Sequence, residues 1–105
     1  LSMKDIGLME MHEAFAAQLL SNLQAFSSKE FAQSELGRGE AVGHPDVDVI
    51  NVMGGSLSIG HPFGATGGRL TMTLLNEMTR RDLQFGLITV CAAGGMGFAM
   101  VVERR

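Results

Sequence analysis

At 105 residues and a net charge of −3, the chain has the length of one domain with a core of its own. Hydrophobic residues make up 46% of the sequence and charged residues 18%, which excludes a disordered chain and a broad basic surface for nucleic acid or anionic lipid. The single cysteine excludes an internal disulfide, and no apolar run approaches the roughly 18 residues of a membrane-spanning helix. Because the chain opens on Leu1 without a targeting pattern, we interpret it as a piece of a longer protein.

The first predicted elements are a short strand over residues 8–11 and a helix that follows it directly. After the strand, apolar residues recur at spacings of three and four, which is typical of one face of a helix: Phe15, Leu19, Leu23 and Phe26. The pattern predicts that the helix begins near His12 or Glu13. Both residues would then lie in its first turn, where unpaired backbone N–H groups favour a negative group or a bound water.

The middle of the chain alternates between loops and regular structure. Residues 27–45 are polar and punctuated by glycine, with a short helix predicted over 29–36. A β-branched strand is predicted over 47–53, and it ends at a glycine-rich loop over 54–68 that surrounds His61. Because a histidine exchanges protons near neutral pH, this loop is the first candidate for an active-site segment.

A further helix follows the glycine loop, with two arginines at its end and an apolar stripe at Leu70, Leu74, Leu75 and Met78. The remaining residues predict two strands, over 85–91 and 98–103, joined by a glycine-rich turn as an antiparallel hairpin. Both strands are apolar almost throughout, so we expect helices on both faces of the sheet. The order of elements predicts one layered α/β domain over 1–105, with a mixed sheet that is covered by helices and ends in the hairpin.

Three groups with acid–base chemistry follow predicted strands in the chain direction: His12, His61 and Cys91. Ligands of layered α/β sheets bind beyond the carboxyl ends of the strands, so these groups are expected to converge on one crevice. The small residues 92–97 would let backbone N–H groups face a developing oxyanion. Structural interpretations stay open, because an unpaired cysteine is often a core residue and a histidine can cap a helix. A zinc site is disfavoured because no paired ligand spacing is present, and the loop lacks the endings of nucleotide-binding loops.

These residues resemble the thiolases, which cleave or form 3-ketoacyl-CoA by Claisen chemistry. Thiolases carry an N-E-A-F motif, a G-G-x-x-x-x-G-H-P-x-G-A-[ST]-G motif and a C-x-x-G-G-x-G motif near the C-terminus, in that order. The matching residues here are 12–15, 54–67 and 91–97, so the resemblance covers essentially the whole chain. The first motif departs from the pattern by having His12 in place of asparagine. In this it resembles the fatty-acid-oxidation branch that includes the trifunctional-complex β subunit.

The resemblance implies catalytic roles for four of the residues. His61 would activate a nucleophilic cysteine and also donate to the thioester oxyanion. Cys91 would be the acid that protonates the departing acetyl-CoA carbanion and the base that deprotonates incoming CoA. His12 would hold the water of the first oxyanion hole. The backbone N–H of Ala93, where the family usually has glycine, would contribute to the second.

The resemblance also implies substrates and partners. Phe15 would line the acyl pocket and Gly60 would contact the substrate, with coenzyme A as a substrate and neither a cofactor nor a metal. The family's nucleophilic cysteine and CoA-binding loop belong to an N-terminal half. The chain would therefore be the C-terminal portion of a 3-ketoacyl-CoA thiolase of β-oxidation, inactive alone and apolar on the surface that pairs with that half.

The implied assembly is a homodimer or higher oligomer, with a hydratase/dehydrogenase α subunit as a further partner and no nucleic acid. The compartment would be cytoplasmic in a bacterium and mitochondrial in a eukaryote. Two other functions stay open. One is a biosynthetic acetoacetyl-CoA thiolase, which differs mainly in substrate length, and the other is a non-catalytic, thiolase-like assembly module.

Overall fold

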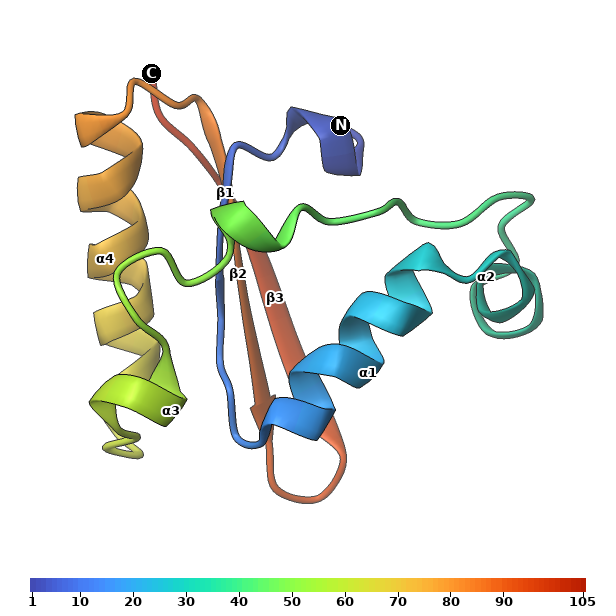
Figure 1. Cartoon of the computed structure of the whole chain (residues 1–105), viewed down its shortest axis with the longest axis horizontal. Coiled ribbons are helices and arrows are strands. Elements are labelled where there is room, and N and C mark those ends of the chain that lie inside the picture. Colours follow the sequence, from blue (N-terminus) through green and yellow to red (C-terminus); the bar gives the residue numbers. More distant parts are fainter.

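The computed structural model describes residues 1–105 and shows a three-stranded mixed sheet with helices beside it (Figure 1). The strands lie in the order β1-β2-β3, with β1 (Leu8–Met11) parallel to β2 (Phe85–Ala92) and β2 antiparallel to β3 (Met96–Glu103). The α-helices are α1 (Ala16–Ser27), α2 (Lys29–Leu36), α3 (Ser56–Ile59) and α4 (Thr66–Arg80). Short 3-10 helices occupy η1 (Met3–Asp5) and η2 (Val47–Val49). The predicted α/β class and the C-terminal hairpin are confirmed.

Helix α4 provides one side of the hydrophobic core. Its apolar stripe faces β1 and β2, and the buried cluster consists of Leu8, Leu70, Leu74, Met78 and Ile88. Burying one such side chain stabilises the fold by roughly 1.5–3 kcal/mol, so this cluster fixes α4 on the sheet. Helix α4 lies close to β2 at Gly86, because a Cβ added at this glycine would lie 2.6 Å from the sulfur of Met78. The predicted stripe is confirmed except for Leu75, which is 42% exposed.

The prediction that the first helix begins at His12 or Glu13 is wrong, because α1 begins only at Ala16. The His12 backbone N–H donates to the Thr89 carbonyl at 2.8 Å, which continues the pairing of β1 with β2 by one residue. The Glu13 side chain is held by contacts from far along the chain, described below. These long-range bonds hold His12 and Glu13, and the chain becomes helical only from Ala16.

The prediction of a strand over 47–53 is also wrong. Residues 47–49 form η2, capped by Asp46, and only a single parallel bridge joins Ile50 to Met9. Asn51 then adopts a φ of 50°. Its side-chain Oδ1 accepts from the N–H of Met11 at 2.8 Å, and its Nδ2 donates to the Met11 carbonyl at 2.9 Å. A polar side chain thus replaces the backbone ladder that a strand would have made.

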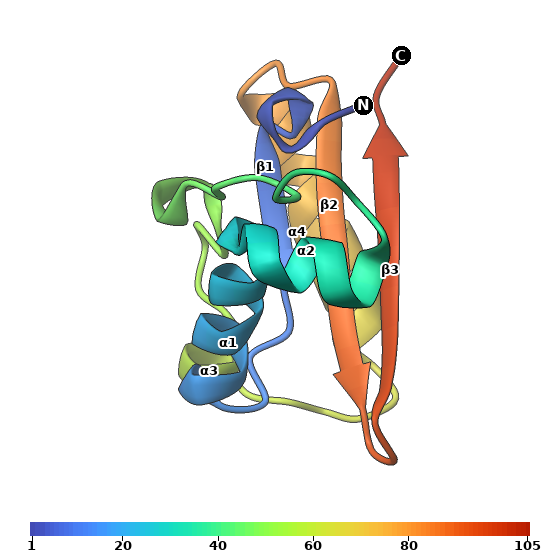
Figure 2. The same cartoon turned by 90° about the vertical axis from the view of Figure 1, so that its right-hand side faces the viewer.

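The sheet is covered unevenly. Helix α4 lies along one side of it, and α1 and α2 lie on the other (Figures 1 and 2). Helix α4 packs on β1 and β2, whereas every residue of β3 except Val102 is exposed. The expectation that both hairpin strands are covered on both faces is therefore wrong for β3. The apolar surface expected from the sequence is present on this strand, at Met96, Phe98, Met100 and Val101. No helix combines the length and apolar character needed to cross a membrane.

Candidate functional site

Two histidines from distant parts of the sequence lie side by side at the carboxyl end of β1. The ring centroids of His12 and His61 are 4.2 Å apart, with the planes tilted by 39°. His12 follows β1 directly and is 5% exposed. His61 is exposed and comes from the loop between α3 and α4. The predicted convergence of these two groups is confirmed.

The His12 ring is held in place by the hydroxyl of Ser56. Its Nδ1 lies 2.7 Å from Oγ of Ser56, the first residue of α3, which itself accepts a hydrogen bond from Nη2 of Arg69 at 3.1 Å. Burial lowers the pKa of His12, and the positive charges of His61 and Arg69 lower it further. His12 is therefore a neutral imidazole near neutral pH, suited to hydrogen bonding rather than to carrying charge.

His61 is held in the same way by a second hydroxyl. Its Nδ1 lies 2.7 Å from Oγ1 of Thr66, the first residue of α4, and this hydroxyl donates to the Pro62 carbonyl at 3.1 Å. Thr66 is 1% exposed, so the anchor is rigid. The loop reaches this position through Gly60, whose φ of 113° is open to glycine and strained for other residues. The Phe63 ring lies 4.8 Å from that of His61 and is exposed.

Cys91 approaches the pair from the neighbouring strand. It lies near the end of β2, is half-buried and is not in a disulfide. It shares a cavity of about 240 Å³ with His12, between the start of α1 and the hairpin. The cavity is lined by His12, Gln18, Asn22, Thr89, Val90, Cys91, Gly95, Met96, Gly97 and Phe98. His12 thus touches His61 and opens onto the same cavity as Cys91, while His61 itself does not line that cavity. The prediction that all three groups converge on one crevice is therefore wrong for His61.

The other predicted site residues lie around this centre. Ala93 opens the turn of the hairpin, where Gly94 and Gly95 have φ values of 81° and 74°. Phe15 caps α1 and is 74% exposed, so in this chain its ring does not line the cavity. The Gly60 carbonyl lies 3.5 Å from Nη2 of Arg69 and is turned toward the interior of the loop.

A clamp that the sequence reasoning missed ties the two histidine-bearing loops together. The Glu13 carboxylate accepts from Nδ2 of Asn51 at 2.8 Å and from the backbone N–H of Leu57 at 3.1 Å. It fills the space beside Gly55, where an added Cβ would lie only 2.1 Å from the carboxylate. The anchors Ser56 and Thr66 were missed as well. Their only signal in the sequence is that both hydroxyls lie within the glycine-rich stretch around His61.

Glu10 and Arg69 carry buried polar atoms that have no hydrogen-bond partner. Glu10 on β1 is fully buried and neither of its carboxylate oxygens has a hydrogen-bond partner, and the same is true of Nε and Nη1 of Arg69. Burial raises the pKa of Glu10 to about 7, although the charge of Arg69 acts in the opposite direction. The carboxyl is therefore half protonated near neutral pH, which is unusual for glutamate.

We expect Glu10→Gln to stabilise the chain above neutral pH and to leave its stability almost unchanged in acid. Below a pH of about 4.5 the carboxyl is protonated in the folded and unfolded states alike. As the pH rises to about 7, the unfolded chain releases the proton while the folded chain keeps it, so the wild type loses stability, by about 3 kcal/mol in full. Urea unfolding across this pH range measures the difference.

The matched control for this substitution is Glu35→Gln, which removes an exposed carboxyl on α2. Its unfolding free energy should follow that of the wild type at every pH. Parallel pH profiles for wild type and Glu10→Gln would contradict the raised pKa, as would a carboxyl carbon signal of Glu10 that titrates near 4.5.

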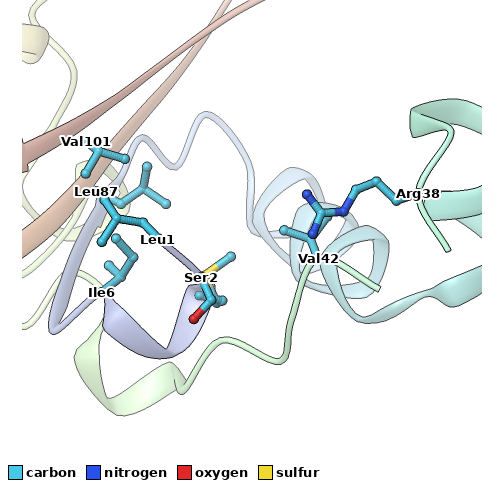
Figure 3. A pocket seen from close by; sticks show the side chains of 8 residues that line it. Leu1, Ser2, Ile6, Arg38, Val42, Leu87 and Val101 are labelled. Atoms are coloured by element: carbon cyan, nitrogen blue, oxygen red, sulfur yellow. The ribbon is translucent and has the colours of Figure 1, made fainter. Parts of the chain in front are cut away.

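Two further features bear on ligands. The chain has no cluster of three or more histidine, cysteine, aspartate or glutamate side chains arranged to hold a metal ion. A second pocket, of about 170 Å³, lies away from the histidines and is mainly apolar (Figure 3). Figure 3 shows Leu87 and Val101 of the sheet on one side of it and Arg38 and Val42 on the other. None of the predicted site residues lines this second pocket.

Known proteins resemble the chain over its full extent. The family model for the thiolase C-terminal domain matches residues 1–104. The 3-ketoacyl-CoA thiolase of Colwellia psychrerythraea is 57% identical over 98% of the chain, and those of Photorhabdus laumondii and Shewanella woodyi are each 55% identical over the same share. In each case the match covers 24% of the relative. The chain thus spans about a quarter of the length of the curated relatives it matches.

Proposed function

Because the chain belongs to the thiolase family, as a C-terminal domain, we propose that it supplies the acid–base half of the active site of a 3-ketoacyl-CoA thiolase. The observation that carries the proposal is the meeting of His12 with His61 at 4.2 Å on one side and with Cys91 in a common cavity on the other. The nucleophilic cysteine would come from a further segment of a longer chain, since Cys91 is the only cysteine here.

The proposed reaction begins with a proton transfer to His61. Its Nε2 takes the proton of the nucleophilic cysteine, whose thiolate attacks the 3-keto carbonyl of a 3-ketoacyl-CoA. The bond between the carbonyl carbon and the neighbouring carbon then breaks, leaving an acyl-enzyme and the enolate of acetyl-CoA. The proton now on Nε2 of His61 and a water held by His12 stabilise the enolate oxygen of the thioester.

Cys91 completes both halves of the reaction. Its thiol protonates the carbon of the enolate and releases acetyl-CoA, which leaves Cys91 as a thiolate. The thiolate takes the proton of an incoming CoA, and the CoA sulfur attacks the acyl-enzyme to give a shortened acyl-CoA. The nucleophilic cysteine leaves as a thiolate and takes back the proton held on Nε2 of His61. The tetrahedral oxyanion of this second step is bound by the backbone N–H of Ala93. Phe15 and Gly60 contact the acyl substrate.

We further propose that the reaction runs in the direction of fatty-acid degradation. His12 in place of the asparagine of the motif supports this branch rather than a biosynthetic acetoacetyl-CoA thiolase. The exposed apolar strand β3 supports pairing with the rest of a longer thiolase and assembly into a dimer or higher oligomer. A hydratase/dehydrogenase α subunit is the proposed further partner.

Thiolysis assays on the chain alone and on the full-length protein that carries it test the proposal. We expect the full-length protein to cleave acetoacetyl-CoA and a long-chain 3-ketoacyl-CoA when CoA is added, and the chain alone to show no turnover. Turnover by the chain alone would overturn the division of roles. A strong preference for acetoacetyl-CoA would favour the biosynthetic alternative, and an inactive full-length protein would favour the assembly module.

A further inference from the structure

The two site histidines are anchored by hydroxyls that look alike and differ in their hydrogen bonding. Ser56 Oγ and Thr66 Oγ1 each lie 2.7 Å from Nδ1 of their histidine. A hydroxyl has one hydrogen to donate and two lone pairs to accept with. The partners of each hydroxyl therefore decide whether it donates to the imidazole or accepts from it. That choice fixes which ring nitrogen of a neutral histidine carries the proton.

Thr66 is placed to accept from His61. Its hydroxyl donates at 3.1 Å to the Pro62 carbonyl, the carbonyl four residues back to which helical threonines commonly bond, and that carbonyl also accepts the backbone N–H groups of Ala65 and Thr66. Thr66 is 1% exposed, so no bulk solvent competes for this hydrogen. With its hydrogen so placed, Thr66 accepts in the 2.7 Å contact, which assigns the ring proton of His61 to Nδ1. Nε2 of the neutral ring keeps its lone pair, as a base requires.

Ser56 is in the opposite situation. Nη2 of Arg69 donates to its oxygen at 3.1 Å, and a guanidinium has no acceptor to offer in return. The hydrogen of Ser56 has no acceptor other than Nδ1 of His12, and Ser56 is 7% exposed. If Nδ1 carried the ring proton, this hydroxyl hydrogen would be buried without a partner, at a cost of about 1–3 kcal/mol. Ser56 therefore donates to Nδ1, and the ring proton of His12 is on Nε2.

We propose that Ser56, with Arg69 behind it, and Thr66 are positioning residues that hold the adjacent imidazoles in opposite tautomers. His12 presents an N–H at Nε2, and His61 presents a lone pair at Nε2. The catalytic meaning of this arrangement rests on the proposed function: one ring is a fixed donor for the oxyanion water, and its neighbour is a base that becomes a donor only after it has taken the thiol proton. The tautomers themselves follow from the hydrogen bonding alone.

Nitrogen-15 NMR of the histidine rings tests the assignment directly. The full-length protein is labelled at histidine ring nitrogens and measured above the histidine titration range, and signals are assigned by their loss in His12→Asn and His61→Asn. We expect a protonated Nε2 and an unprotonated Nδ1 for His12, and the reverse for His61. The same tautomer in both rings, or an even mixture in either, would overturn the proposal.

Thr66→Val is the sharpest variant, because it keeps the shape of the side chain and removes the hydroxyl. We expect the His61 ring signals to change to a mixture of tautomers and kcat to fall about 10²-fold with little change in KM, well within the roughly 10⁴-fold that a wrong histidine tautomer costs a serine protease. Thr71→Val is the matched control, since Thr71 makes the same bond to the carbonyl four residues back in α4 and contacts no histidine. It should leave the spectrum and kcat unchanged.

Ser56→Ala tests the other ring, with Ser58→Ala as its control on α3, where the hydroxyl bonds only to the Gly55 carbonyl. The His12 signals should change in the first variant and not in the second. Unchanged His12 signals in Ser56→Ala would contradict the role of that hydroxyl. If the expected tautomers are found in a protein without thiolysis activity, the proposed function fails and the assignment stands. If an active protein shows equal tautomers, the assignment fails and the function stands.

Discussion

Replacing His61 with asparagine in the full-length thiolase is expected to lower kcat/KM for thiolysis by at least about 10³-fold. Asparagine can donate a hydrogen bond but cannot take a proton, so the nucleophilic cysteine would stay a thiol. Alkylation by iodoacetamide reports on the thiolate without involving the substrate. Its rate at the nucleophilic cysteine should therefore fall together with kcat/KM.

His44→Asn is the matched control for this variant, because His44 lies exposed in the segment between α2 and η2 and far from the site in the sequence. It should keep wild-type kinetics and alkylation. Since His61 is exposed, its replacement should leave the melting temperature nearly unchanged, which separates lost chemistry from lost folding. A His61→Asn enzyme within a few fold of wild-type kcat/KM would refute the assignment of this residue as the base.

Replacing Cys91 with alanine is expected to impair carbon–carbon cleavage and to leave acylation of the nucleophilic cysteine intact. Carbon–carbon cleavage needs a proton at the carbon of the enolate, so thiolysis of a 3-ketoacyl-CoA should fall by about 10²–10⁴-fold. Acylation of the nucleophile by acetyl-CoA expels a CoA thiolate, which is a good leaving group and can take its proton from water afterwards, so this step does not need the acid Cys91. The acetylated enzyme should therefore still form, and mass spectrometry of the intact protein detects it.

Cys91→Ser gives the second arm of this experiment. A serine hydroxyl keeps the size and polarity of the side chain but is too weak an acid to protonate the enolate efficiently, so Ser should resemble Ala in the assay. Equal thiolysis in wild type and Cys91→Ser would refute the acid–base role. Loss of acetylation along with thiolysis in both variants would instead show that Cys91 is needed for the shape of the cavity that it shares with His12.

The parts of the fold that depend on local pattern could be predicted from the sequence. The apolar stripe of α4 follows the period of a helix, and the apolar residues of β2 and β3 form short runs joined by a glycine-rich turn. Each pattern can be recognised from a few neighbouring residues. The meeting of His12 and His61 was predicted as well, but only the argument for His12 holds, because His12 follows β1 whereas the His61 loop follows η2 and α3 and no strand. The motifs of the thiolase family then indicated which roles to propose for these groups.

The parts that failed depend on side chains that reach across the sequence. Residues 47–53 have the composition of a strand, but Asn51 directs its amide to Met11 and Glu13 and turns the chain away from the sheet. The same bond holds the Glu13 side chain away from a helical turn, and α1 begins only at Ala16. Neither contact has a local signature, because the partners are 38 to 40 residues apart. The anchoring of the rings by Ser56 and Thr66 is likewise visible only in three dimensions.

The strand order β1-β2-β3 has a consequence for how the site comes into being. Strands β2 and β3 are neighbours in sequence and can pair through a short turn, whereas β1 must find β2 across the whole segment that carries α1 to α4. Because a longer loop costs more entropy to close, we expect the local hairpin to form before the β1–β2 contact, which amide hydrogen exchange during refolding would measure. His12 arrives with β1. On this expectation the histidine pair forms only when β1 pairs with β2, after the hairpin is in place.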